Sequence, residues 1–159
     1  MVVTSAKKYQ VLVHGDFPEK LAAAGFLYRA GGVIRKKRTF SFTIPENLPY
    51  ESADTVFHTL KRGGGFSLLQ AELGTGRMHQ IRATLCSLGF PVAGDKLYGV
   101  DERFYLKLKE DSLSDGDRAK LLLDRQALHC CKLNFLHPYT GENMEFESEL
   151  PEKMAKLMR

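Results

Sequence analysis

The stretch Gly74-Thr75-Gly76-Arg77-Met78-His79-Gln80-Ile81-Arg82 decides the interpretation of this 159-residue chain, because a glycine-containing turn leads there into a helical pattern. Apolar residues then recur at helical spacing and form one stripe: Met78, Ile81, Leu85 and Leu88. The pattern predicts a helix over 78–88 whose stripe faces a core, with Gly89 and Pro91 ending it.

Arg82 lies beside this stripe rather than opposite it, since helical residues advance by about 100° each. Its guanidinium therefore emerges at the rim of the core, where a carboxylate or phosphate is its natural partner. His79 lies one turn earlier on the same side, and the helix dipole favours an anion near the turn 74–76. Spacing alone favours a simpler interpretation, in which Arg82 closes a structural salt bridge and the glycines form only a turn.

Strands are predicted on both sides of this helix. They cover residues 9–15, 39–44, 54–60, 66–73, 127–135 and 142–147, with a hairpin at Gly63-Gly64-Gly65. Further helices are predicted over 18–24, within the charged stretch 101–124, and from Pro151 onward. Antiparallel pairs combined with a few helices indicate the α+β class, with a mixed, mainly antiparallel sheet and flanking helices.

Composition excludes some classes of protein. No apolar run approaches the roughly 20 residues that span a bilayer, and the start of the chain lacks the order of a secretory signal, so we expect no membrane partner. Lys and Arg number 23 against 19 Asp and Glu, an excess that permits a polyanionic partner. The cysteines, Cys86, Cys130 and Cys131, suggest neither a disulfide framework nor a zinc site, so we expect no metal and a cytoplasmic location.

The opening stretch, together with the segment from Leu88 to Gly99, resembles a signature of the RluA-type RNA pseudouridine synthases. That signature reads T-G-R-x-H-Q-I-R, then G-x-P-x-x-G-D-x-x-Y-G; Met78 and Phe90 are mild departures from it. Residues 7–15 resemble the family's K-x-Y-x-A-x-V-x-G strand, and residues 127–141 its L-H-A-x-x-L-x-F-x-H-P-x-T-G end. The resemblance covers residues 7–159.

This resemblance implies the pseudouridine synthase catalytic fold and isomerisation of uridine to pseudouridine in ribosomal or transfer RNA, without a cofactor. By resemblance, Tyr9 stacks on the target base and Arg82 pairs with the catalytic aspartate. A phenol ring offers a flat platform, and a guanidinium keeps a buried carboxylate ionised and oriented.

RNA contacts are predicted at basic and polar residues around these two. They are Lys7, Arg77, His79, Gln80, and the run Arg35, Lys36, Lys37 and Arg38. The run 35–38 can equally be a solvated hairpin tip, and the other residues can serve local capping and turn bonds.

The catalytic aspartate itself is missing from the sequence. In the family it lies in an R-L-D-x-x-T-S-G-L motif before the K-x-Y strand, whereas no Arg-Leu-Asp occurs in this chain. Asp95 fits a turn-capping role, and Asp16 and Asp54 have no motif support. We therefore expect residues 1–159 to be an N-terminally truncated catalytic domain, inactive alone, in which Arg82 awaits an acid group that the chain does not carry.

Three explanations stay open for the missing aspartate. The chain is a C-terminal portion of a longer enzyme, which we favour, or a natural short relative that has lost the chemistry. In the third, a separate N-terminal fragment supplies the aspartate. The alternative function is a non-catalytic RNA-binding module that keeps the synthase scaffold; a protein-interaction domain without an RNA role has less support. Truncation also predicts an exposed sheet edge through which the chain could dimerise.

Overall fold

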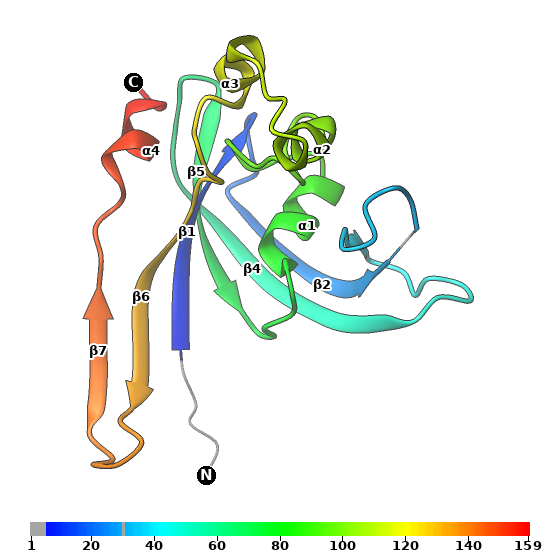
Figure 1. Ribbon diagram of the computed structural model, residues 1–159. Coiled ribbons are helices and arrows are strands. Elements are labelled where there is room, and N and C mark those ends of the chain that lie inside the picture. The colour runs from blue at the N-terminus through cyan, green and yellow to red at the C-terminus, as the bar shows by residue number, and fades with distance from the viewer. Residues whose placement is uncertain (1–5, 30) are drawn as a thin grey trace.

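The computed structural model describes residues 6–29 and 31–159 and contains one curved sheet with helices beside it (Figure 1). Its seven strands are ordered β3-β2-β4-β5-β1-β6-β7, and all the strand pairs are antiparallel. The strands are β1 (Ala6–His14), β2 (Lys20–Tyr28), β3 (Thr39–Ser41), β4 (Tyr50–Gly63), β5 (Phe66–Leu73), β6 (Leu128–Leu136) and β7 (Asn143–Glu147). The helices are α1 (Gln80–Ser87), α2 (Arg103–Lys109), α3 (Asp115–Leu121) and α4 (Glu152–Lys156). This arrangement confirms the α+β class.

Strand β1 lies in the interior of the sheet, between β5 and β6. Its central residues Val11, Leu12 and Val13 are fully buried, as expected for an apolar run covered on both faces. The strand therefore holds its N-terminal part, which includes Tyr9, at a fixed position beside the end of β5.

Helix α1 lies against β2 and β3 on the concave face of the sheet (Figure 1). Ile81 and Leu85 of the predicted apolar stripe are buried in the core and Leu88 packs against it, whereas Met78 is exposed. Met78 departs from the stripe because His79 adopts a left-handed conformation, with φ of 60°, and the helix begins only at Gln80.

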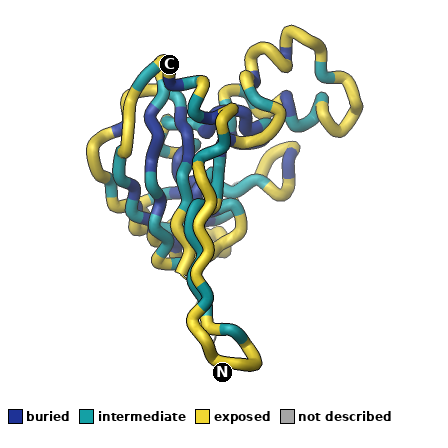
Figure 2. The backbone as a smooth tube through the Cα atoms, turned by 90° about the vertical axis from the view of Figure 1, so that its left-hand side faces the viewer, coloured by how far each residue is buried: buried dark blue, intermediate teal, exposed yellow. Residues whose placement is uncertain are grey.

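The hairpin of β6 and β7 extends away from the helices and is largely exposed at its end, as Figure 2 shows. Helices α2 and α3 form the predicted excursion near α1, and α4 follows the hairpin. No helix in the described ranges 6–29 and 31–159 is long and apolar enough to cross a membrane.

The predicted helix over 18–24 is wrong, because this segment enters strand β2. Its alanines favour a helix locally, but β2 pairs along its whole length with β4 and buries Ala23 and Leu27 from one face. The predicted strand 39–44 is real but shorter, since β3 ends at Ser41. The hairpin 54–73 and the strands near 127–135 and 142–147 are confirmed.

Candidate functional site

An open pocket of about 560 Å³ lies where the N-terminal part of β1 meets the loop after β5. Its lining comes from β1, from the end of β5 and from that loop: Ala6, Lys7, Lys8, Tyr9, Glu72, Leu73, Gly74, Thr75, Gly76 and Arg77. The structure thus brings together three residues that the sequence singled out separately, Lys7, Tyr9 and Arg77.

Tyr9 contributes the aromatic ring of this pocket. In the sheet it pairs with Ala71 of β5 and Cys130 of β6, at a β-bulge, so the backbone on both sides fixes its position. Partial burial raises the pKa of the Tyr9 phenol, with a smaller contribution from Cys130. The ring is therefore a neutral phenol at neutral pH, suited to stacking against a base.

The loop from Gly74 to His79 is held in place by the buried side chain of Gln80. The amide oxygen accepts hydrogen bonds from the Thr75 hydroxyl (2.8 Å) and the Arg77 backbone NH (3.0 Å). The amide nitrogen donates to the Asp54 carbonyl (2.9 Å) and the Thr55 hydroxyl (2.8 Å). All four contacts are internal, so the geometry gives Gln80 a positioning role in the loop, in contrast to the predicted RNA contact.

Arg77 lies at the rim of the pocket and is restrained by β4. Its Nε donates to the Ser52 carbonyl (3.1 Å), and its Nη1 lies 3.9 Å from the Glu51 carboxylate. Arg38 pairs with the same carboxylate, so Glu51 bridges the pocket rim and the basic run 35–38.

Arg82 is already paired within the chain, with a carboxylate that the sequence analysis interpreted only as a turn cap. Its Nε and Nη2 donate to the two carboxylate oxygens of Asp95 at 2.6 and 2.8 Å. The Asp95 side chain is fully buried and that of Arg82 is 15% exposed. A bidentate pair of this kind fixes the plane of the guanidinium.

Asp95 also caps its own turn, as the sequence predicted. Its Oδ1 accepts the backbone NH groups of Leu97 (2.9 Å) and Tyr98 (3.0 Å). Burial alone would raise the pKa of Asp95, but the hydrogen bonds and charge of Arg82 outweigh it and lower that pKa. The carboxylate is enclosed and fully hydrogen-bonded, which disfavours Asp95 as a nucleophile toward RNA.

One guanidinium nitrogen of Arg82 stays available. The hydrogen bonds to Asp95 use Nε and Nη2, and within residues 6–29 and 31–159 no hydrogen bond of Nη1 is found. A second carboxylate could therefore approach Arg82 without displacing Asp95.

Tyr98 connects Arg82 with two other predicted site residues. The Arg82 guanidinium lies 5.0 Å from the centre of the Tyr98 ring, a cation–π distance. The Tyr98 hydroxyl accepts the backbone NH of Arg38 at 2.9 Å and lies 3.0 Å from Nδ1 of His79. Burial lowers the pKa of His79 and Arg82 lowers it further, which keeps the imidazole neutral at neutral pH.

The basic run 35–38 divides into two pairs. Arg35 and Lys36 are exposed in a turn, whereas Lys37 pairs with Glu102 and Arg38 with Glu51. The exposed half is accessible to a polyanion, and the paired half fixes the loop to the rest of the fold.

The predicted residues thus form two groups joined by the loop 74–79. The pocket contains Lys7, Tyr9 and Arg77, and the second group comprises His79, Arg82 and the loop at Arg38. Sequence reasoning missed Tyr98 as a member of the site and treated Asp95 only as a turn cap. Both belong to the G-D-x-x-Y-G segment, so the signal was present in the signature.

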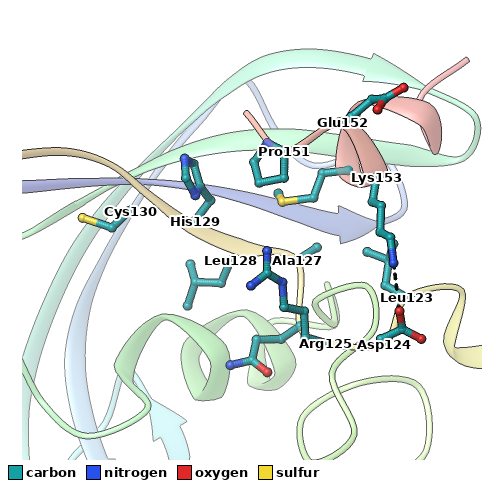
Figure 3. Close-up of a pocket in the computed structure, with 12 residues that line it drawn as sticks. Leu123, Asp124, Arg125, Ala127, Leu128, His129, Cys130, Pro151, Glu152 and Lys153 are labelled. Atoms are coloured by element: carbon teal, nitrogen blue, oxygen red, sulfur yellow. Dashed lines mark hydrogen bonds and ion pairs between the residues drawn. The ribbon is translucent and has the colours of Figure 1, made fainter. Parts of the chain in front are cut away.

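A second pocket, of about 390 Å³, lies at the other end of β6 (Figure 3). It is lined by residues 123–130 and 151–154, and an ion pair between Asp124 and Lys153 crosses its edge. None of the predicted site residues lines it. In the described part of the chain, no group of three or more His, Cys, Asp or Glu residues could hold a metal ion.

Comparison with known proteins gives a consistent result. The family model described as "RNA pseudouridylate synthase" matches residues 4–87. The chain is 37% identical over 155 residues to "Uncharacterized RNA pseudouridine synthase YlyB" of Bacillus subtilis, covering 98% of the chain and 44% of that protein. It is 36% identical over 154 residues to "Ribosomal large subunit pseudouridine synthase D" of Buchnera aphidicola, covering 96% of the chain and 44% of that protein.

Two solved human structures share the fold. RNA Pseudouridylate Synthase Domain Containing 1 matches with a TM-score of 0.67 at 23% identity, over 91% of this chain and 54% of that one. RNA Pseudouridylate Synthase Domain Containing 4 matches with a TM-score of 0.65 at 20% identity, over 97% of this chain and 62% of that one. The chain therefore spans less than half the length of the two curated relatives and somewhat more than half of these structures.

Proposed function

Because the chain belongs to the RNA pseudouridylate synthase family, we propose that it forms part of an enzyme that isomerises uridine in RNA to pseudouridine. In this reaction the N1–C1′ bond of the nucleotide breaks, the uracil turns over, and C5 bonds to the same sugar carbon while losing its hydrogen. The enzyme works in the cytoplasm on ribosomal or transfer RNA. The name of the relative from Buchnera refers to the large ribosomal subunit, which favours ribosomal RNA.

The observation that carries this proposal is the shared pocket of Lys7, Tyr9 and Arg77 beside the loop that leads to Arg82. A flipped-out uracil stacks on the Tyr9 ring, and the two cations bind neighbouring phosphates. The backbone at Gly76 borders open space, since a Cβ there would meet nothing within 4 Å, so a nucleotide has room to approach it.

The nucleophilic aspartate comes from a segment outside this chain and is oriented by Nη1 of Arg82. Asp95 holds the guanidinium from its other edge, so Arg82 is fixed before that second carboxylate arrives. A prepositioned cation next to a carboxylate keeps the acid ionised and oriented. The chain alone is therefore inactive, and the upstream reading frame is expected to encode Arg-Leu-Asp.

The experiment compares cellular RNA with and without the gene that encodes this chain. Pseudouridine is mapped chemically in both, and the full-length gene is returned as a rescue. We expect at least one pseudouridine to disappear and to return with the wild-type gene but not with a Tyr9→Ala variant that still accumulates. Unchanged pseudouridine in every cellular RNA would reject the proposed function.

A non-catalytic RNA-binding module is the second candidate, favoured by the enclosure of Asp95 and the absence of Arg-Leu-Asp from the chain. It predicts binding to structured RNA that weakens steeply with salt and a gene that begins at Met1. An in-frame Arg-Leu-Asp upstream of Met1 would decide against it.

Dimerisation through a sheet edge is a further part of the proposal. Strand β7 is an edge strand whose residues are mostly exposed. Its outward backbone groups can pair with the edge strand of a second copy of the chain. Sedimentation of the chain tests this proposal. A dimer that is lost in Glu145→Pro supports it, and a monomer at all concentrations contradicts it.

A further inference from the structure

Tyr98 touches three separate parts of the second group. The residue is 1% exposed, and its ring centre lies 5.0 Å from the Arg82 guanidinium. Its hydroxyl contacts the backbone of Arg38 and the imidazole of His79. A buried residue with these contacts is placed to fix the relative positions of the helix, the turn 94–99 and the basic run.

The hydrogen bonds of the hydroxyl determine where its proton points. A backbone NH can only donate, so the Tyr98 oxygen accepts from Arg38. If Nδ1 of His79 also donated, the buried hydroxyl proton would have no acceptor among the described residues. The hydroxyl therefore donates to Nδ1, and the proton of the neutral imidazole lies on Nε2.

We propose that Tyr98 is a positioning residue that fixes His79 as its Nε2–H tautomer, so that His79 offers a hydrogen-bond donor to a phosphate oxygen of the RNA substrate. The proposal rests on the proposed function and adds a residue to which the resemblance assigned no role. Within the described ranges, no hydrogen-bond partner of Nε2 is found, so this donor is available.

The charges around His79 favour an anion. Arg82, Arg38 and Lys36 act on the imidazole with positive charge, and Asp95 opposes them. Asp95 and Arg82 offset each other as a bidentate pair, so the remaining charges on the imidazole are the positive ones of Arg38 and Lys36. A neutral N–H donor surrounded by cations is better suited to bind a phosphate oxygen than to bind a cationic or apolar group of a ligand.

The same contacts hold Arg82 from two sides. Asp95 binds one edge of the guanidinium and the Tyr98 ring covers one face, which leaves the Nη1 edge open. Removing the hydroxyl should therefore release His79 while leaving the ring against Arg82.

The test uses nitrogen-15 NMR of His79 in the 159-residue chain, where the shifts of Nδ1 and Nε2 report the tautomer directly. Wild-type chain should show a protonated Nε2 and a bare Nδ1. Tyr98→Phe should give a mixture of tautomers and faster hydrogen exchange at the Arg38 amide. Affinity for a structured RNA should fall by about twofold if the two tautomers become equally populated, because only the Nε2–H form offers the donor, and the salt slope should stay unchanged because no charge is removed.

Tyr139→Phe is the matched control, since Tyr139 is 94% exposed and lies outside the site. It should leave the tautomer, the exchange rate and the affinity unchanged. A protonated Nδ1 in the wild-type chain overturns the proposal even if Tyr98→Phe fails to fold. An unchanged His79 in a folded Tyr98→Phe variant overturns it as well, as does unchanged RNA affinity after the tautomer has shifted.

These results are independent of catalysis, because the tautomer is measured without turnover. Absence of pseudouridine formation by the full-length protein would reject the proposed function and leave the tautomer measurement standing. A wrong tautomer in an active enzyme would reject the role of Tyr98 alone.

Discussion

At the scale of single residues, the pair of Arg82 and Asp95 links stability to the site. The carboxylate is buried and accepts four hydrogen bonds, two of them from the guanidinium. Under the proposed function, Arg82 also orients a second carboxylate. Loss of activity on its substitution would then have two causes, so its contribution to stability must be measured separately.

Arg82→Met should lower the free energy of unfolding by about 3–5 kcal/mol, because it leaves the Asp95 charge buried without its partner. Urea unfolding of the chain at pH 7 measures this change. Arg103→Met is the control, since Arg103 pairs with Asp101 while its side chain is 78% exposed, and it should change stability far less than Arg82→Met does. Equal effects of the two substitutions would contradict the structural importance of Asp95.

Two histidines predict how stability depends on pH. Burial lowers the pKa of both His14 and His79 from the ordinary value of 6.5. Below pH 6.5 the unfolded chain therefore binds more protons than the folded one, and stability falls as the pH drops from 7 toward 5. Carboxylates with lowered pKa values, such as Asp95, change the folding stability only below about pH 4, where the unfolded chain begins to bind their protons.

The measurement is urea unfolding at pH 7 and pH 5 in a buffer of constant ionic strength. A variant with both His14→Gln and His79→Gln should lose less stability between these pH values than the wild-type chain. A wild-type chain that is more stable at pH 5 than at pH 7 would show that the sign is wrong.

At the scale of elements, Gln80 holds the loop 74–79 through its side-chain hydrogen bonds. Gln80→Ala removes four hydrogen bonds and leaves the buried Thr55 hydroxyl without its partner, whereas the Asp54 carbonyl still accepts the Gly74 NH. We expect a loss of about 1–3 kcal/mol and faster hydrogen exchange at the Arg77 amide. The exposed Gln126→Ala is the control, and protection of Arg77 equal to wild type would contradict this role.

The turn 94–99 makes a similar prediction at Gly99. A Cβ there would lie 1.9 Å from the Asp95 carbonyl oxygen, so Gly99→Ala must displace the turn that carries Asp95 and Tyr98. We expect about 1–3 kcal/mol of destabilisation from this overpacking in thermal or urea unfolding. Gly76→Ala, where a Cβ meets nothing within 4 Å, should be near neutral; a Gly99→Ala variant as stable as Gly76→Ala would contradict the packing.

Sequence reasoning predicted the elements whose local pattern and tertiary setting agree. The apolar stripe around Ile81 and Leu85 gave α1, and the glycines at 63–65 gave the β4–β5 hairpin. It failed at 18–24, where alanines favour a helix but pairing with β4 decides for a strand. The residues of β4 that pair with this segment lie about 35 positions away in the chain. The local hydrophobic pattern of 18–24 therefore does not indicate the pairing.

The site was predicted in the same uneven way. Lys7, Tyr9 and Arg77 share a pocket because β1 and β5 are neighbours, which the resemblance implied through the fold. The sequence did not predict Asp95 as the partner of Arg82, because the local pattern Gly94-Asp95 indicates only a turn cap. The pairing of Asp95 with Arg82 depends on how the turn packs against α1.

At the scale of the whole molecule, one sheet carries both the pocket at Tyr9 and the pair of Arg82 and Asp95, and we propose that a segment outside this chain completes the site. It spans 44% of the length of the curated relatives from Bacillus and Buchnera, and it contains no Arg-Leu-Asp. Arg82 is fixed by Asp95 with Nη1 open, which is the arrangement expected if another segment supplies the nucleophile.

The most direct test of this central claim measures tritium release from RNA that contains 5-tritiated uridine, with the 159-residue chain and the full-length protein side by side. Tritium leaves C5 only when the new carbon–carbon bond forms. We predict release by the full-length protein, no release by the chain alone, and none by a full-length variant whose upstream Arg-Leu-Asp aspartate is replaced by asparagine. Release by the chain alone at the full-length rate, or none from the full-length protein, would contradict the claim.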